Sequence, residues 1–143
     1  MRTRNILWPT DFSDTASHAL RYAIEMANLY NVGIRILNVV DQPLGDENYM
    51  VLAITPEELA KSMEDAAAKQ MHELLAQLKT DLKIETVIRR GDAVTEILAE
   101  ANGEDIGMVV IASHGRTGLS HFLHDNVAEE VANKAKCPVL VVK

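Results

Sequence analysis

Short apolar runs alternate along the chain with longer segments in which apolar residues recur every three or four positions. The apolar runs cover residues 5–9, 33–40, 83–89, 108–112 and 138–142, and most are rich in valine and isoleucine. Runs of this length and composition predict strands, whereas the segments at 14–31, 56–78, 93–102 and 126–135 have helical spacing. Strands that alternate with helices predict an α/β domain with a mostly parallel sheet of about five strands.

Polar residues mark where the predicted helices begin and end. Ser13 or Asp14, then Thr55 and later Asp92, each stand directly before a helical pattern, and these residue types favour the N-cap position. Asn31 follows the first helical segment and is a suitable stop signal. The boundaries between predicted strands and helices are therefore defined by specific capping residues.

The composition places the chain in one class of protein. Its 143 residues, 48% of them hydrophobic, fit a single domain over residues 1–143. Only 4% are aromatic, so the core must consist of small and branched aliphatic residues, with Met63 and Met71 filling gaps from their helix. A net charge of -7 argues against nucleic acid or an anionic membrane as partner. One cysteine, Cys137, and no apolar stretch of signal-peptide or membrane-spanning length predict a cytoplasmic protein.

The fourth predicted strand ends at Ile111 and Ala112 and opens into a stretch that contains Gly115 and Gly118. Glycines before a helix leave backbone N–H groups uncovered, and such groups bind anions. The stretch is therefore a candidate phosphate-binding loop, and the alternative is a long turn that needs glycine for its geometry. If the first strand is central in the sheet, this loop and residues 9–13 meet where the winding reverses, which is where such folds bind ligands.

Several motifs together resemble the universal stress protein family. They are Asn5 to Ser13, Gly91-Asp92, Ala112 to Leu119, Asn126 to Glu129 and Cys137 to Val142, and they follow one another over essentially the whole chain. The resemblance implies a single doubly wound, five-stranded, Rossmann-like parallel sheet in the order 3-2-1-4-5, with helices on both faces. It also implies a homodimer with a regulatory or protective role and at most slow ATP hydrolysis. The family has a branch that binds ATP or related adenine nucleotides and a branch that does not.

The nucleotide-binding branch has a pattern of Gly, two residues, Gly, nine residues, and Gly-Ser or Gly-Thr. In this chain the corresponding positions are Ala112, Gly115 and the pair Asp125-Asn126, so only Gly115 is kept. Ala112 still permits a fairly close approach of the backbone. Asp125 is the more serious departure, because as a helix N-cap it would occupy amides that a phosphate needs, and its charge would repel the phosphate.

The resemblance implies that the chain binds ATP or AMP, with Mg²⁺ as a possible companion and no catalytic residues, and the charge of Asp125 predicts that this binding is weak. The implied nucleotide-binding residues are Pro9, Thr10, Asp11, Val39, Ile111, Ala112, His114, Gly115, Arg116, Gly118, Asp125, Asn126 and Val127. Asp11 suits ribose hydroxyls, with a turn or cap role as the alternative. Arg116 either clamps a phosphate or faces solvent.

Other chemistries have weaker support. Ser13 lacks the glycine-flanked turn of a hydrolase nucleophile, and His121 and His124 near Asp125 are only a loose match to a metal site. The alternative function is a member of the same fold that binds no nucleotide and acts only through protein contacts. The apolar last strand, 139–142, lies at the predicted edge of the sheet and is expected to pair with a second copy.

Overall fold

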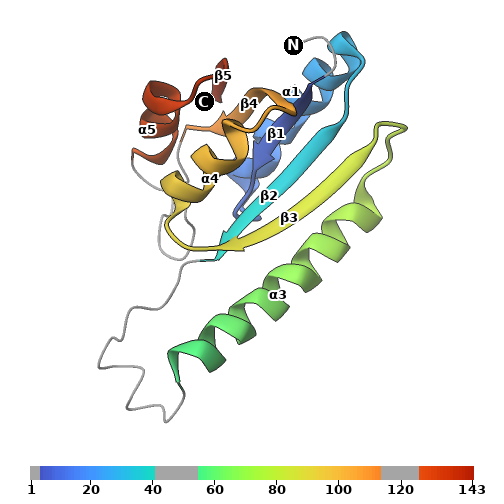
Figure 1. Ribbon diagram of the computed structural model, residues 1–143. Coiled ribbons are helices and arrows are strands. Elements are labelled where there is room, and N and C mark those ends of the chain that lie inside the picture. Colours follow the sequence, from blue (N-terminus) through green and yellow to red (C-terminus); the bar gives the residue numbers. More distant parts are fainter. Residues whose placement is uncertain (1–3, 41–54, 114–125) are drawn as a thin grey trace.

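Five parallel strands form one sheet in the order β3-β2-β1-β4-β5, as the sequence predicts (Figure 1). The computed structural model describes residues 4–40, 55–113 and 126–143. The strands are β1 (Asn5–Pro9), β2 (Ile34–Val40), β3 (Ile84–Arg90), β4 (Ile106–Ala112) and β5 (Val139–Val142). The sequence patterns therefore located every strand of this sheet to within two residues at each end.

The helices lie on both faces of the sheet. They are α1 (Asp14–Tyr30), α3 (Pro56–Gln77), α4 (Ala93–Ala101) and α5 (Val127–Lys134). The chain moves from β1 through β2 to β3 in one direction and from there through β4 to β5 in the other. Because such connections are right-handed, α1 and α3 cover one face, and α4 and α5 cover the opposite face. In Figure 1, α4 and α5 lie in front of the sheet and α1 behind it.

Side-chain caps begin three of the helices where the sequence predicts them. Ser13, Thr55 and Asp92 each accept a hydrogen bond from the backbone N–H three residues later, at 3.2, 3.0 and 3.1 Å. Of the two candidates before α1, the N-cap is Ser13. At the other end of α1, Asn31 has a left-handed backbone with φ 56°, a conformation that asparagine tolerates better than most residues. Local polar residues thus fix the helix boundaries.

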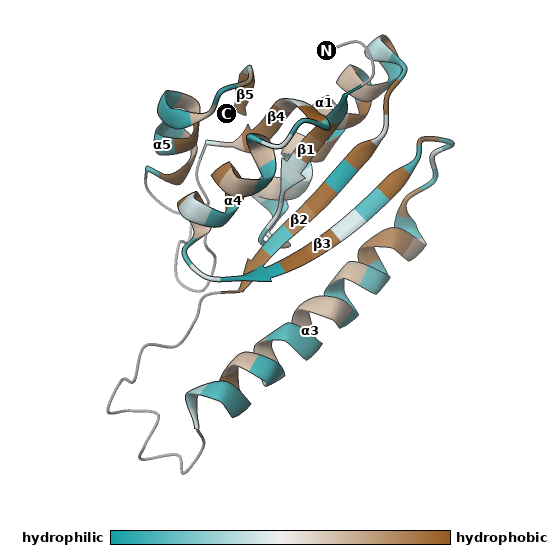
Figure 2. Cartoon of the chain, viewed as in Figure 1, coloured by the Kyte–Doolittle hydropathy of each residue, from teal (hydrophilic) through white to brown (hydrophobic). Residues whose placement is uncertain are grey.

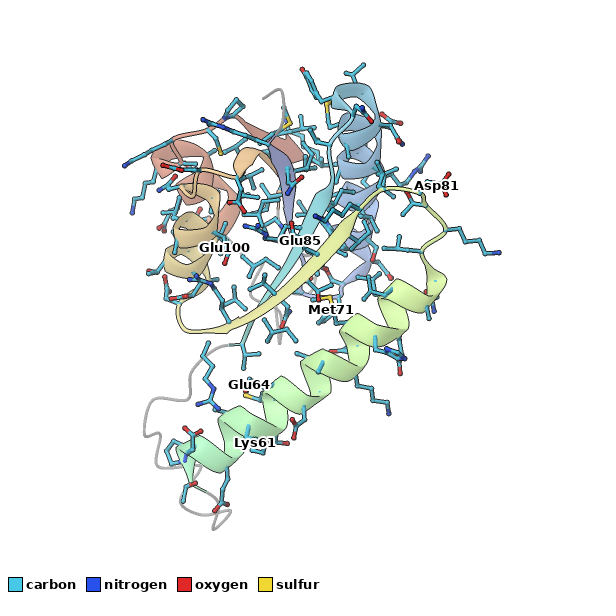
Figure 3. The ribbon with its side chains drawn as sticks, turned by 45° about the vertical axis from the view of Figure 1, so that its right-hand side comes forward. Lys61, Glu64, Met71, Asp81, Glu85 and Glu100 are labelled. Carbon is cyan, nitrogen blue, oxygen red and sulfur yellow. The ribbon has the colours of Figure 1, made fainter. Side chains whose placement is uncertain are left out.

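The core lies between the sheet and its helices and is built from aliphatic side chains. Figure 2 shows apolar residues concentrated on the strands. Met71 points from α3 toward the sheet and is buried, as expected (Figure 3). The expectation for Met63 is wrong, because this side chain is 36% exposed. α3 packs on the edge strand β3 and its neighbour β2 and buries only a narrow stripe through Ala60, Ala67 and Met71. Met63 lies beside that stripe.

Among the described helices, none is long and apolar enough to cross a membrane.

Candidate functional site

The carboxyl ends of β1 and β4 are neighbours at the point where the winding of the sheet reverses. β1 pairs in parallel with β2 on one side and with β4 on the other. The chain continues from β1 into α1 on one face, whereas α5, the next described helix after β4, is on the opposite face. Doubly wound sheets bind their ligands beyond the strands at such a reversal. The first strand is central, as predicted, and residues 9–11 lie at the same edge of the sheet as Ile111 and Ala112.

The backbone that follows β1 is fixed to β2. The Thr10 amide donates a hydrogen bond to the carbonyl of Leu37 at 2.8 Å, and the Thr10 carbonyl accepts one from the Asn38 side-chain amide at 2.8 Å. Thr10, Asp11 and Asn38 are the buried polar residues of the described chain. Buried polar groups need hydrogen-bond partners, so these contacts set the direction in which the chain leaves the sheet.

Two further side-chain bonds shape the loop itself. The Asp11 carboxylate accepts a hydrogen bond from the Ser13 amide at 3.0 Å, and the Thr10 hydroxyl oxygen accepts one from the Phe12 amide at 3.0 Å. Phe12 has a φ of 65°, which is uncommon for a bulky residue. The turn role foreseen for Asp11 is therefore present, while the cap of α1 belongs to Ser13. The bond from the Ser13 amide orients the Asp11 carboxylate at the edge of the sheet.

The apolar residues of the predicted site belong to the core of the sheet. Pro9 and Val39 are buried at the ends of β1 and β2, and Ile111 and Ala112 are buried at the end of β4. Beyond them, the Ser113 amide donates a hydrogen bond to the Val142 carbonyl at 2.8 Å, which extends the pairing of β4 with β5. That these residues contact a nucleotide stays a prediction.

The last part of the predicted site is the start of α5. Asn126 is the N-cap, so the expectation that Asp125 would cap this helix is wrong. Asn126 has a left-handed backbone with φ 73°, and its side chain forms no capping hydrogen bond. Val127, the first helical residue, is buried. Asparagine is one of the few residues other than glycine that adopt this conformation readily.

The remaining predicted residues lie outside the described part of the chain. They are His114, Gly115, Arg116, Gly118 and Asp125, together with the histidines weighed as a metal site, His121 and His124. Within residues 4–40, 55–113 and 126–143, no cluster of three histidine, cysteine or acidic side chains is arranged to hold a metal ion.

One residue at this edge was missed by the sequence analysis. Asn38 holds the Thr10 carbonyl, and its signal was available as the single polar amide within the apolar run of β2. A buried asparagine in a strand needs a specific partner, and here that partner is the backbone of the candidate site.

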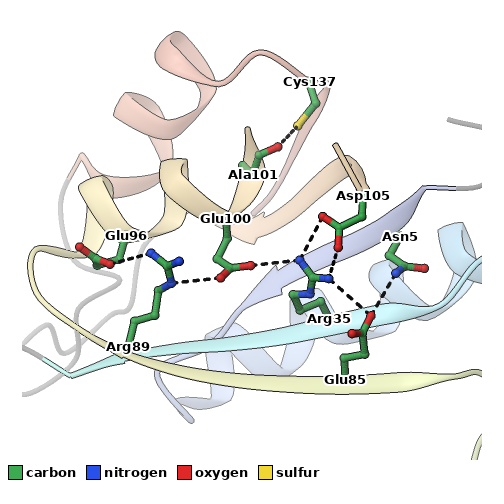
Figure 4. A network of polar contacts seen from close by, with 9 residues as sticks. All are labelled: Asn5, Arg35, Glu85, Arg89, Glu96, Glu100, Ala101, Asp105 and Cys137. Atoms are coloured by element: carbon green, nitrogen blue, oxygen red, sulfur yellow. Dashed lines mark hydrogen bonds and ion pairs between the residues drawn. The ribbon is translucent and has the colours of Figure 1, made fainter. Parts of the chain in front are cut away.

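A network of charged side chains lies between the sheet and α4 (Figure 4). Arg35 of β2 contacts Glu100 of α4 at 3.1 Å and Glu85 of β3 at 3.6 Å, and it also pairs with Asp105 before β4. Hydrogen bonding from Arg35 lowers the pKa of Asp105 below its usual value. Arg89 of β3 binds the other oxygen of Glu100 at 3.0 Å. The network ties α4 to β3 and to β2, the strand that pairs with β1 beside the candidate site.

A second pair of contacts ties the end of β3 to α3. Arg90, the last residue of β3, pairs with Glu64 and with Glu57, the latter at 2.8 Å. Figure 3 shows Glu64 on the side of α3 that faces β3. The two hydrogen bonds raise the pKa of Arg90 above its already high value and lower that of Glu57. These contacts position the first turns of α3.

The geometry defines a class of protein: a doubly wound α/β domain with a buried polar loop at its topological switch point. A model of the universal stress protein family matches residues 2–143. The chain belongs to the universal stress protein family.

Individual relatives agree with this assignment. The universal stress protein MJ0577 of Methanocaldococcus jannaschii is 29% identical over 98% of this chain and 94% of its own. Its solved structure superimposes with a TM-score of 0.79 at 30% identity, covering 100% of this chain and 97% of that one. The likeness therefore extends over the whole length of both proteins.

Two other solved structures of the family hold nucleotides. One is a universal stress protein in complex with cAMP, with a TM-score of 0.62, 21% identity and coverage of 100% of this chain and 99% of that one. The other, from Archaeoglobus fulgidus, is in complex with dAMP, with a TM-score of 0.60, 23% identity and full coverage of both chains. At these identities the likeness shows a common fold.

Proposed function

We propose that the protein is a cytoplasmic, regulatory or protective homodimer that binds an adenine nucleotide at the carboxyl edge of β1 and β4. The observation that carries this proposal is the loop of Thr10 and Asp11, buried and fixed by hydrogen bonds at the switch point. Two proteins of the same fold bind cAMP and dAMP. Both ligands contain an adenine base and a single phosphate, so the proposal names an adenine nucleotide and not the triphosphate alone.

The described residues suit the parts of such a ligand. A carboxylate in a fixed orientation, as Asp11 is, accepts hydrogen bonds from ribose hydroxyls at little entropic cost. The first turn of α5 lacks a cap from the Asn126 side chain, and uncapped helix amides attract phosphate. The Asp11 carboxylate lies in the loop after β1, and the first-turn amides of α5 belong to the helix that follows β4. The two therefore flank the switch point from opposite sides.

Calorimetry on the purified protein tests the proposal. ATP and AMP are titrated into the wild type, into Asp11→Asn, and into Asp14→Asn as the matched control. Asparagine keeps an oxygen for the Ser13 amide but loses the negative charge. We therefore expect Asp11→Asn to lower the affinity for both nucleotides at least tenfold. Asp14 is exposed in the first turn of α1, and its substitution should leave affinity unchanged. Equal affinities in the two variants would contradict the role given to Asp11.

The sequence favours weak binding with little preference for ATP over AMP. Asp125 stands where the nucleotide-binding pattern has glycine. A carboxylate about 5 Å from a phosphate charge, at an effective dielectric near 20, costs on the order of 3 kcal/mol. Asp125→Asn removes this charge, and we expect it to raise the affinity for ATP more than the affinity for AMP. If the substitution instead lowers the affinity for ATP, and does so only when Mg²⁺ is present, the carboxylate holds the metal and the repulsion argument is wrong.

The second candidate function is a family member that binds no nucleotide and acts through protein contacts. The departure at Asp125-Asn126 favours it, since Asn126 has φ 73°, a conformation unfavourable for the serine or threonine of the pattern. Wild-type protein that binds neither ATP nor AMP at millimolar concentration, with or without Mg²⁺, would establish this alternative and refute the first.

The homodimer is proposed to form through β5. β5 is an edge strand of four apolar residues, of which Val141 is exposed, Val139 and Leu140 are half-buried and Val142 is buried. An apolar edge strand pairs readily with a second copy, and twofold pairing covers both edges. Sedimentation should show a dimer at micromolar concentration, and Val141→Lys should weaken it. A monomeric wild type would refute this part of the proposal.

A further inference from the structure

An apolar stripe on α1 remains exposed in the single chain. The described residues expose five large apolar side chains, and three of them, Tyr22, Leu29 and Tyr30, belong to α1. Met26 lies between them and is half-buried. These four residues are spaced by four, three and one, so they form one stripe on the helix. This stripe is called the α1 flank below.

The α1 flank faces the side of the molecule where β5 ends the sheet. The buried line of α1 includes Ala19, Ala23 and Ala27, and Tyr22, Met26 and Tyr30 each follow one of these by three residues. Three residues correspond to a turn of about 60° from the sheet-facing line. Because the connection from β1 through α1 to β2 is right-handed, this turn points away from β2 and toward β4 and β5. α1 itself contacts β4 and β5.

Pairing of the β5 strands alone provides only a short contact, compared with the surface area that a stable dimer buries. Four residues of β5 make an edge of only about 13 Å, whereas a stable interface buries roughly 800 Å² on each partner. Tyr22 and Tyr30 are 39% and 40% exposed, and Leu29 is 71% exposed. A tyrosine side chain has a surface of about 200 Å², so each of these tyrosines has roughly 80 Å² of exposed surface that an interface would bury.

We infer that the α1 flank is the second half of the homodimer interface. This inference rests on the proposed pairing of β5. Twofold pairing of β5 continues the sheet through both protomers and puts the two copies of α1 on the same face, antiparallel to each other. α1 lies over β1 and β4, so at about 4.8 Å per strand the two helix axes are roughly 19 Å apart. A gap of this width is bridged by large side chains reaching from both helices, and the α1 flank supplies them over the seam of the two β5 strands.

Charge on α1 agrees with this assignment. The α1 flank has no charged residue, whereas the opposite side of the helix carries the charged Arg21 and the polar Ser17 and Asn28, all exposed. Each chain has a net charge of -7, so an interface made by the α1 flank avoids adding close contacts between acidic groups, with the exposed Glu25 at its border as the acidic residue nearest to it on α1. The apolar side of α1 is therefore the side suited to a second copy of this chain.

Sedimentation velocity on the full chain, over a range of concentrations, tests the inference. The test variant is Tyr22→Lys with Leu29→Lys, and the matched control is Ser17→Lys with Asn28→Lys, which adds the same charge on the other side of α1. Loss of two central apolar side chains should weaken dimerisation at least a hundredfold. The control should dimerise within a few-fold of the wild type. Leu29→Lys alone, at a largely exposed position, should weaken dimerisation at least tenfold and serves if the double variant does not fold by circular dichroism.

The outcomes separate this inference from the proposal on which it rests. A test variant that dimerises as tightly as the wild type, while Val141→Lys is monomeric, overturns the role of the α1 flank and keeps the β5 dimer. A monomeric wild type overturns both. Weakening in the test variant and in Val141→Lys, with an unchanged control, is the result expected from one continuous interface of β5 and the α1 flank.

Discussion

Replacing Arg35 by methionine is expected to destabilise the fold by about 3 kcal/mol at neutral pH. Methionine keeps most of the apolar length of the arginine side chain, so the change removes mainly its charge and hydrogen bonds. The Arg35 and Glu100 side chains are 13% and 11% exposed and lie 3.1 Å apart. Breaking a pair of this kind by removing one partner costs about 3–5 kcal/mol, because the other charge stays buried.

The other contacts of Arg35 place the expected loss at the lower end of that range. Glu100 retains its contact with Arg89 at 3.0 Å, so it is not left without a cation. The Glu85 and Asp105 side chains are 40% and 56% exposed. In the variant, water therefore replaces much of the stabilisation that these carboxylates receive from Arg35. What remains is three carboxylates around one position without their shared cation.

The loss should depend on pH in a defined direction. Arg35 lowers the pKa of Asp105 in the folded protein. A carboxyl group whose pKa is lowered by folding adds stability above its unfolded pKa and loses that contribution as the pH falls through the folded value. The wild type therefore loses this advantage below about pH 4, near the unfolded pKa of aspartate. The difference between wild type and Arg35→Met should shrink there.

Urea denaturation at pH 7 and at pH 3.5 measures both effects. Arg21→Met, at an exposed position on α1, is the matched control and should change the free energy of unfolding by less than about 0.5 kcal/mol. If Arg35→Met costs no more than Arg21→Met at pH 7, the network contributes nothing to stability. An equal loss at both pH values would show that lost packing, not charge, is the cause.

Three further measurements follow from single positions. Gly91→Ala should lower stability by about 1–2 kcal/mol in urea denaturation, because Gly91 has a φ of 141° that alanine rarely adopts; unchanged stability would mean that the turn relaxes. Cys137 should react with a thiol reagent at pH 7.5 at least tenfold more slowly than free cysteine, because burial raises the pKa of its thiol, and a rate equal to that of free cysteine contradicts this. Trp8 is buried and donates a hydrogen bond to the carbonyl of Ala16 at 3.0 Å, so ATP binding near the first turn of α1 should change its emission saturably. Binding seen by calorimetry with flat emission would show that this turn does not respond.

Much of the fold could be predicted because its determinants are local. Ser13, Thr55 and Asp92 cap their helices through bonds that span three residues, and such bonds are visible as a sequence pattern. The strand order, by contrast, was implied only by the family resemblance. Met63 could not be placed correctly in the same way. Its exposure depends on how far α3 extends over the edge of the sheet, which is a tertiary property.

The candidate site was predictable only in part. The meeting of the β1 and β4 ends follows from topology once β1 is central, and Asp11 was named as a site residue by the family resemblance. The role of Asn38 needed the register between β1 and β2, which brings its amide to the Thr10 carbonyl. The left-handed backbone of Asn126 was also not evident, since the pattern around it suggested a cap at Asp125.

β2 connects the two polar regions of the molecule, and this connection has a consequence for how they respond to mutation. Arg35 near its start holds α4 and β3, while Asn38, three residues later, holds the loop of Thr10 and Asp11. Between these residues lie Ile36 and Leu37, both fully buried. Close packing on both sides keeps the strand from sliding along its neighbours, because a shift of one residue would reverse which side chains face each helix layer. Loss of Arg35 should therefore lower the free energy of unfolding without moving Asn38, so that nucleotide affinity changes far less than stability.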